Sequence, residues 1–228
     1  MFNKFKELFS SENLLESAYT TTVKMLEFDY QMYEASRSVL RDTDGCELPF
    51  DIRKMDRKIN KFEREVRRNV LTHLTVAGMT NLVPGLALVS IVISVERIGD
   101  YTKNIVELAR DHEPKLNCGN QESNFQLIEA TIARHFPTTI EVLKTQDKKL
   151  GREIMAAQKE LSKTVDAICS GLIKTGGGSD LTTGDAVCAG LYSRYLKRVN
   201  SHLTTISSAI VNPFTRIGFR EKRKKTDT

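Results

Sequence analysis

The sequence predicts an all-α protein built as two tandem three-helix bundles, with six long helices related by an internal repeat. Glycine and proline are scarce, at 13 and 5 of 228 residues, so few residues break helices. Apolar residues recur at spacings of three and four over long runs, and no run alternates as a strand would. Two segments about 100 residues apart, 94–105 and 195–206, share Arg, β-branched and Ile positions, which predicts a duplicated unit.

The first predicted bundle covers residues 11–116 and holds three helices. Its first helix follows an apolar stripe over 14–39, and the second follows a stripe over 52–70 with charged residues between the apolar ones. The third helix is apolar almost all round over 84–95 and has a proline in its first turn. A helix of that kind is expected in the middle of a bundle, enclosed by the others.

The second predicted bundle covers residues 121–212. Helical patterns extend over 122–148, 150–174 and 181–211. Pro137 falls inside the first of these and is expected to kink it or divide it. The run of three glycines before the last helix predicts a connector, because no Gly-Lys-Ser/Thr follows it and no strand precedes it.

The two ends of the chain differ from its body in charge. Residues 1–10 form a short amphipathic segment, and 213–228 form a basic tail. Six of the 34 basic and two of the 29 acidic residues lie in 216–228, which leaves 28 and 27 for the rest. Because the body is nearly neutral and offers no concentrated basic face, we expect no nucleic-acid partner. The tail predicts peripheral contact with an anionic membrane surface.

Cysteine usage and hydropathy predict a cytoplasmic protein. The four cysteines are widely spaced and form no Cys-x-x-Cys pair, which favours reduced thiols. The most apolar stretch, 82–95, is 14 residues long and contains Pro84 and Gly85, short of the roughly 20 residues that a membrane span needs. The start of the sequence has no apolar signal core. We therefore expect no transmembrane helix.

Two rows of acidic and amide side chains are the strongest candidates for chemistry. Glu96 and Asp100 are four residues apart and share one face of the third helix. Asp56, Asn60 and Glu63 form a comparable row on the second. If these helices pack antiparallel, the rows converge into an oxygen-rich patch suited to a divalent or ferric ion such as iron, zinc or manganese. The candidate metal ligands are Asp56, Glu63, Glu96 and Asp100.

Two other roles for the same carboxylates stay open at this point. They can form salt bridges with Arg97 or with a neighbouring helix, because acid pairs four residues apart are common on helices. A metal-dependent hydrolase or redox bundle would also need a base nearby, and the sequence nominates none. The four histidines form no Glu-x-x-His or His-Glu-x-x-His motif. No catalytic residue is assigned, and a non-catalytic protein is predicted.

The string Glu-Arg-Ile-Gly-Asp at 96–100, followed by Asn-Ile at 104–105, resembles the signature of the PhoU family of phosphate-uptake regulators. The row over 56–63 resembles the partner motif of that family, and the resemblance covers about 14–210. It implies two three-helix bundles with surface metal clusters. The resemblance also implies that the protein catalyses no reaction of its own. It implies instead a regulatory partnership with a phosphate transporter, or with the ATPase or sensor kinase of that transporter. A homo-oligomer such as a dimer is expected.

The second half departs from this pattern. Its matching positions are Ser162, Asp166, Lys197 and Ser201, of which one is acidic. A lysine at a ligand position repels a cation, so any metal is expected in the first half alone. The asymmetry suggests a divergent subgroup, such as an accessory protein of a low-affinity or sodium-coupled phosphate carrier.

Overall fold

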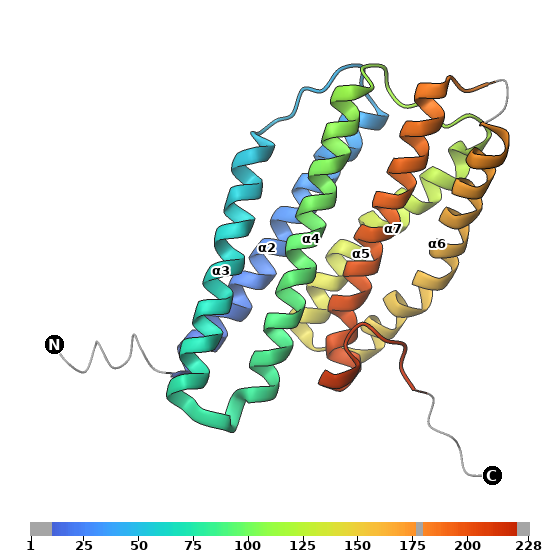
Figure 1. Ribbon diagram of the computed structural model, residues 1–228. Coiled ribbons are helices and arrows are strands. Elements are labelled where there is room, and N and C mark those ends of the chain that lie inside the picture. The colour runs from blue at the N-terminus through green and yellow to red at the C-terminus, as the bar shows by residue number, and fades with distance from the viewer. Residues whose placement is uncertain (1–10, 177–179, 223–228) are drawn as a thin grey trace, which may run out of the picture.

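The structure is a computed structural model that describes residues 11–176 and 180–222 (Figure 1). Over these residues the chain forms six long helices and three short 3-10 turns, without a strand, which confirms the all-α prediction. The predicted amphipathic segment 1–10 and the end of the basic tail, 223–228, lie outside the described residues. The long helices are α2 (Ser11–Arg41), α3 (Ile52–Ala77), α4 (Leu82–Asp111), α5 (Glu122–Thr145), α6 (Lys148–Thr175) and α7 (Thr183–Val211). The 3-10 turns are η1 (Gly78–Asn81), η2 (Gly119–Gln121) and η3 (Phe214–Arg216).

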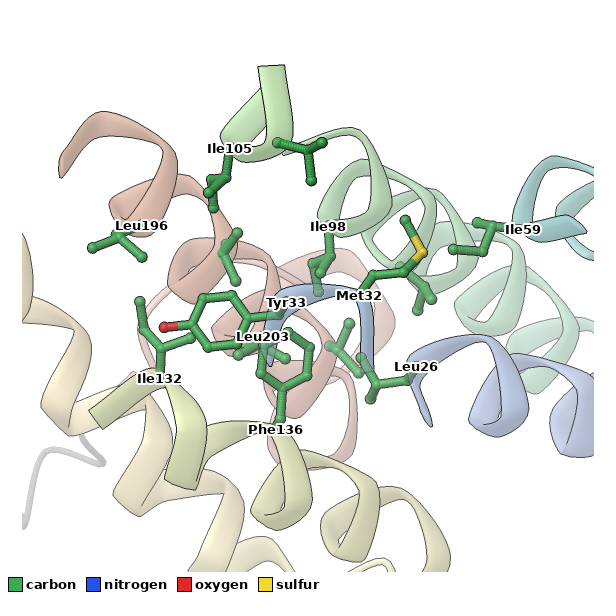
Figure 2. Packing of buried hydrophobic residues seen from close by; sticks show 14 of the residues in the cluster. Leu26, Met32, Tyr33, Ile59, Ile98, Ile105, Ile132, Phe136, Leu196 and Leu203 are labelled. Carbon is green, nitrogen blue, oxygen red and sulfur yellow. The ribbon is translucent and has the colours of Figure 1, made fainter. Parts of the chain in front are cut away.

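The six helices pack around one continuous hydrophobic core. Helices α2, α3 and α4 pack on one another, and α7 packs on α5 and α6. Helix α4 also packs against α7, and α2 against α5, so the two groups of helices share an interface. Figure 2 shows the result: Tyr33 of α2 and Ile98 of α4 meet Phe136 of α5 and Leu203 of α7 in a single apolar cluster.

The helix starts repeat between the two halves. Asp51 accepts hydrogen bonds from two backbone N–H groups at the start of α3, and Asp147 does the same at the start of α6. Each carboxylate satisfies donors that the first turn of a helix leaves free. The chain turns from α5 into α6 within two residues, because Gln146 adopts a left-handed φ of 58° just before Asp147. This turn ends α5 at Thr145, three residues before the predicted end.

Pro137 does not divide α5, which is continuous from Glu122 to Thr145. Of the two predicted outcomes, a kink or a division, the division is therefore ruled out. Proline removes the hydrogen bond to the carbonyl four residues earlier, here that of Ala133. Pro137 lies on the exposed face of the helix, where water can bond to the freed carbonyl.

Helix α4 is enclosed by its neighbours over only part of its length. Ile98, Ile105 and Val106 are buried completely, but Val83 and Ile93 are 57 % and 40 % exposed. The prediction of an enclosed helix is therefore wrong for its first turns. Among the described helices, α4 is the one long and apolar enough to cross a membrane by length and composition, and 44 % of its most apolar 18-residue window is buried. A core helix of a bundle passes the same test.

Helix α3 carries a basic face that the whole-chain charge conceals. Between Arg53 and Arg68 it holds eight basic and three acidic residues, and all eight basic side chains are exposed. The expectation of no concentrated basic face is therefore wrong for this helix. The expectation failed because it used the net charge of the whole body of the chain, in which acidic residues on other helices cancel the basic residues of α3. The electrostatic potential at the surface of α3 depends mainly on the charges of α3 itself.

Candidate functional site

The predicted rows of acidic residues converge between α3 and α4. The two helices form an antiparallel hairpin through η1, which places their polar rows side by side. Lys103 Nζ lies 3.0 Å from Asp56 Oδ1 and 3.2 Å from Asp100 Oδ1. Asn60 donates a hydrogen bond to the other oxygen of Asp56 at 3.4 Å. Asp56 and Asp100 thus meet as expected, and the ammonium group of Lys103 bridges them.

The other two candidate ligands have basic neighbours of their own. Arg97 reaches both Glu96, at 3.6 Å, and Asp100, at 3.2 Å. Glu63 pairs with Arg67 one turn later, at 2.6 Å. Burial is the largest influence on the pKa of Glu96 and raises it, and the negative charge of Asp100 acts in the same direction. Each candidate ligand therefore lies beside a basic side chain.

Asp29 of α2 belongs to the same cluster, and the sequence reasoning missed it. Its side chain is completely buried, and neither carboxylate oxygen has a hydrogen-bond partner among the described residues. Burial raises the pKa of Asp29 well above its ordinary value, and the negative charges of Glu96 and Asp100 raise it further. Gly99 leaves room for this carboxyl, because a Cβ there would lie 3.0 Å from Asp29 Oδ1.

A periodicity signal for Asp29 is present in the sequence. The buried face of α2 contains Ala18, Met25 and Met32 at spacings of seven, and Asp29 lies four residues after Met25. An apolar stripe over 14–39 takes Phe28 at this turn, because Phe28 is apolar, but the structure leaves Phe28 half-buried. A stripe drawn by spacing alone, without avoiding charged residues, includes Asp29.

The cluster has the right chemistry for a hard cation, but a lysine takes the bridging position. Carboxylate oxygens are the ligands that divalent and ferric ions prefer, and the buried Asp29 carboxyl lacks a partner. Within 11–176 and 180–222, no three His, Cys, Asp or Glu side chains are grouped to hold one metal ion. Asp56 and Asp100 converge on Lys103 instead. These residues therefore supply the ligand types of a hard cation, while the basic side chains beside them occupy the positions that the ion would take.

The second half repeats the arrangement of acid and lysine in simpler form. Lys197 Nζ lies 2.7 Å from both carboxylate oxygens of Asp166, and Arg194 lies 3.3 Å from one of them. Ser162 accepts a hydrogen bond from Gln158. In both halves a lysine from the last helix of the unit contacts an acid on the middle helix.

His202 packs in the interface between α4 and α7. Its ring stacks on Tyr101 with a centroid distance of 5.8 Å, and its Nε2 is buried without a hydrogen-bond partner among the described residues. Burial lowers the pKa of His202 to about 4, and the positive charges of Arg198 and Arg97 contribute. A neutral histidine at this position packs across the contact between α7 and α4. Arg97, whose positive charge acts on His202, also pairs with Glu96 and Asp100 of the acidic cluster.

We expect His202 to make the protein less stable in acid. Its pKa is lowered in the folded state, so below the ordinary histidine value of about 6.5 the unfolded chain binds a proton that the folded chain does not. Stability therefore falls as the pH drops from about 6.5 towards about 4. Urea unfolding across this range should show a smaller fall for His202→Phe than for the natural chain. Equal slopes would contradict the assignment.

Three comparisons relate this geometry to known proteins. The family model described as "PhoU domain" matches residues 22–109, which contain the acidic cluster. The crystal structure of PhoU from Pseudomonas aeruginosa superposes with a TM-score of 0.67 at 16 % identity, covering 92 % of this chain and 97 % of that one. The phosphate transport system regulatory protein PhoU from Streptococcus pneumoniae gives a TM-score of 0.64 at 12 % identity, covering 90 % and 93 %. Among curated proteins, none matches this sequence.

Proposed function

This chain is a PhoU-domain protein with the PhoU fold, and on that premise we propose that it is a non-catalytic regulator or accessory protein of phosphate transport and phosphate signalling. It acts through contacts with a phosphate transporter or with its ATPase or sensor kinase. The observation that carries the proposal is the match of the PhoU domain to residues 22–109, the segment that holds the whole acidic cluster. The Streptococcus pneumoniae relative is described as a phosphate transport regulator, which supports the same role.

The geometry of the cluster supports docking more than turnover. Lys103, Arg97 and Arg67 form ion pairs with the carboxylates on the surface of the α3–α4 hairpin. Surface charges of both signs, arranged in a pattern, set the orientation of a protein partner with the complementary pattern. A hydrolase or redox site would instead need a general base near an open coordination position. Turnover that is lost in Glu96→Ala at unchanged stability would overturn the regulatory role.

Uptake of radiolabelled phosphate tests the role directly. Cells of the native host that lack this chain should take up phosphate at a changed rate, and the natural chain should restore it. Sulfate uptake serves as the control, because a general loss of membrane energy would change both. Uptake of phosphate that is the same with and without the chain, in phosphate-rich and phosphate-poor medium, contradicts the proposal.

We also propose that iron, zinc or manganese binds the cluster when Lys103 is displaced. Asp56, Asp100, Glu96 and Glu63 would hold the ion, and it would supply positive charge that neutralises the cluster without a reaction. The support is the partnerless Asp29 carboxyl beside Glu96 and Asp100.

Lys103→Met is expected to make the cluster sensitive to metal ions. It removes the ammonium group between Asp56 and Asp100, so the melting temperature should fall, and added manganese or zinc should restore it. The melting temperature of the natural chain should respond less at the same ion concentration. Lys163→Met is the control, because Lys163 pairs with Glu160 on the exposed face of α6. Equal indifference of both variants to metal would rule out this site.

A further inference from the structure

The end of the α3–α4 hairpin is an uncharged segment in a highly charged chain. Residues 69–95, between Arg68 and Glu96, contain no Asp, Glu, Lys or Arg, although such residues make up 28 % of the sequence. This segment, called the hairpin tip below, comprises the end of α3, the turn η1 and the first turns of α4. The end of a helical hairpin on a bundle is normally polar, because water surrounds it.

The hairpin tip exposes large apolar side chains. Of the eleven large hydrophobic residues that are exposed among the described parts of the chain, six lie in the hairpin tip. Val76, Met79 and Val83, around the turn, are 67 %, 77 % and 57 % exposed. The other three are Leu71, Leu86 and Ile93. Grouped exposure of this kind marks an interaction surface, whereas scattered apolar residues need no explanation.

The dimensions of the hairpin tip fit the boundary of a bilayer. Its α4 part, from Leu82 to Val95, has 14 residues and is roughly 21 Å long, less than a hydrocarbon core of about 30 Å. Apolar segments of this length belong to cores or to interfacial structures. The turn lies at the end of the bundle where α2 begins and α7 ends (Figure 1).

Basic side chains border the hairpin tip where lipid phosphates would lie. Arg64 and Arg68 are exposed on α3, and Arg68 is ten residues before Gly78, roughly 15 Å along the helix from the turn. On the other side η3 packs on α4, which places the exposed Arg220 and Lys222 on the chain just beyond it. Long basic side chains reach phosphate groups while the surface below them stays apolar.

We propose that the hairpin tip docks on the surface of an anionic lipid bilayer. Val76, Met79 and Val83 enter the boundary between headgroups and acyl chains, and Arg64 and Arg68 contact lipid phosphates. Charge complementarity favours an anionic bilayer: the tip itself carries no charged side chain, and the flanking residues 63–68, 96–97 and 220–222 hold six basic and four acidic side chains, a net positive margin. The docking does not depend on the phosphate role, and either can fail alone.

Single tryptophans test the proposal, because the chain contains no natural tryptophan. Met79→Trp reports on the hairpin tip. Leu127→Trp is the control, since Leu127 is 63 % exposed in α5, a helix that begins at the end of the bundle opposite to the α3–α4 turn (Figure 1). Full-length protein is mixed with vesicles of phosphatidylcholine, with or without about one third phosphatidylglycerol. We expect a blue shift and quenching by brominated lipid for Met79→Trp with anionic vesicles, and neither for Leu127→Trp.

Co-sedimentation with the same vesicles measures the affinity. Val83→Asp should weaken binding to anionic vesicles at least tenfold, whereas Leu127→Asp should leave it unchanged. Circular dichroism should show both variants folded, because both side chains are exposed. The proposal is overturned if the natural chain does not sediment with anionic vesicles. It is equally overturned if the natural chain sediments but the fluorescence of the Met79→Trp variant is not shifted by the same vesicles. It is also overturned if Val83→Asp disrupts an oligomer in the absence of lipid, since the tip would then join copies of this chain.

Discussion

Replacing Arg41 by methionine is expected to lower the free energy of unfolding by about 3 to 5 kcal/mol, which is the usual cost of breaking a buried ion pair. Arg41 of α2 lies 2.8 Å from Glu129 of α5, and their side chains are 6 % and 8 % exposed. Arg41 also bonds to Glu122 and to the Leu116 carbonyl, and Tyr192 of α7 donates to Glu129 at 2.9 Å. The variant leaves a buried carboxylate without its positive partner.

Thermal and urea unfolding measure the effect of Arg41→Met. At about 2 to 4 °C for each kcal/mol in a chain of this size, the melting temperature should fall by about 10 °C. Arg37→Met is the matched control on the same helix, because its partner Asp42 is 47 % exposed and such pairs contribute about 0 to 1 kcal/mol. The double variant Arg41→Met, Glu129→Leu should recover much of the loss. Equal effects of Arg41→Met and Arg37→Met would contradict the assignment.

This network shows what sequence patterns do not contain. Apolar spacing predicted all six helices, because each helix buries one face and the period shows in its own residues. The contact between Arg41 and Glu129 joins positions 88 residues apart, in different halves. Nothing local in the sequence pairs them. The tandem bundles follow from periodicity, whereas the single core that unites them depends on long-range packing of α4 on α7 and α2 on α5.

The candidate site was predicted in part for the same reason. Spacing placed Asp56 and Asp100 on facing rows, and the hairpin brings them to one point. Lys103 is three residues after Asp100, so helical spacing alone predicts their pairing. Asp29 was missed because charged residues are not expected in an apolar stripe, although its spacing fits. The residue that violates the hydrophobic pattern of α2 is thus the buried carboxyl that feels the charges of Glu96 and Asp100.

Asp29→Asn is expected to stabilise the protein at neutral and alkaline pH. Burial, together with the charges of Glu96 and Asp100, raises the pKa of Asp29 in the folded state. Above the unfolded value of about 3.9, the folded chain therefore holds a proton that the unfolded chain has lost. The stability that Asp29 contributes is complete below about 3.9 and is lost as the pH rises towards the folded pKa. Asparagine has nearly the same shape and no such loss.

The pH dependence of this variant decides how the cluster is neutralised. The stability gained in Asp29→Asn relative to the natural chain should grow by about 1.4 kcal/mol for each pH unit between the unfolded and the folded pKa of Asp29. Urea unfolding from weak acid to alkaline buffer measures this growth. Asp166→Asn is the control, because Asp166 is 56 % exposed and already paired with Lys197, so its loss costs little. If Asp29→Asn is instead less stable than the natural chain throughout, Asp29 is ionised and a bound cation compensates it. Metal content that falls in Asp29→Asn and not in Asp166→Asn would identify that cation as a metal ion, and the lysine bridge between Asp56 and Asp100 would then be the state without metal.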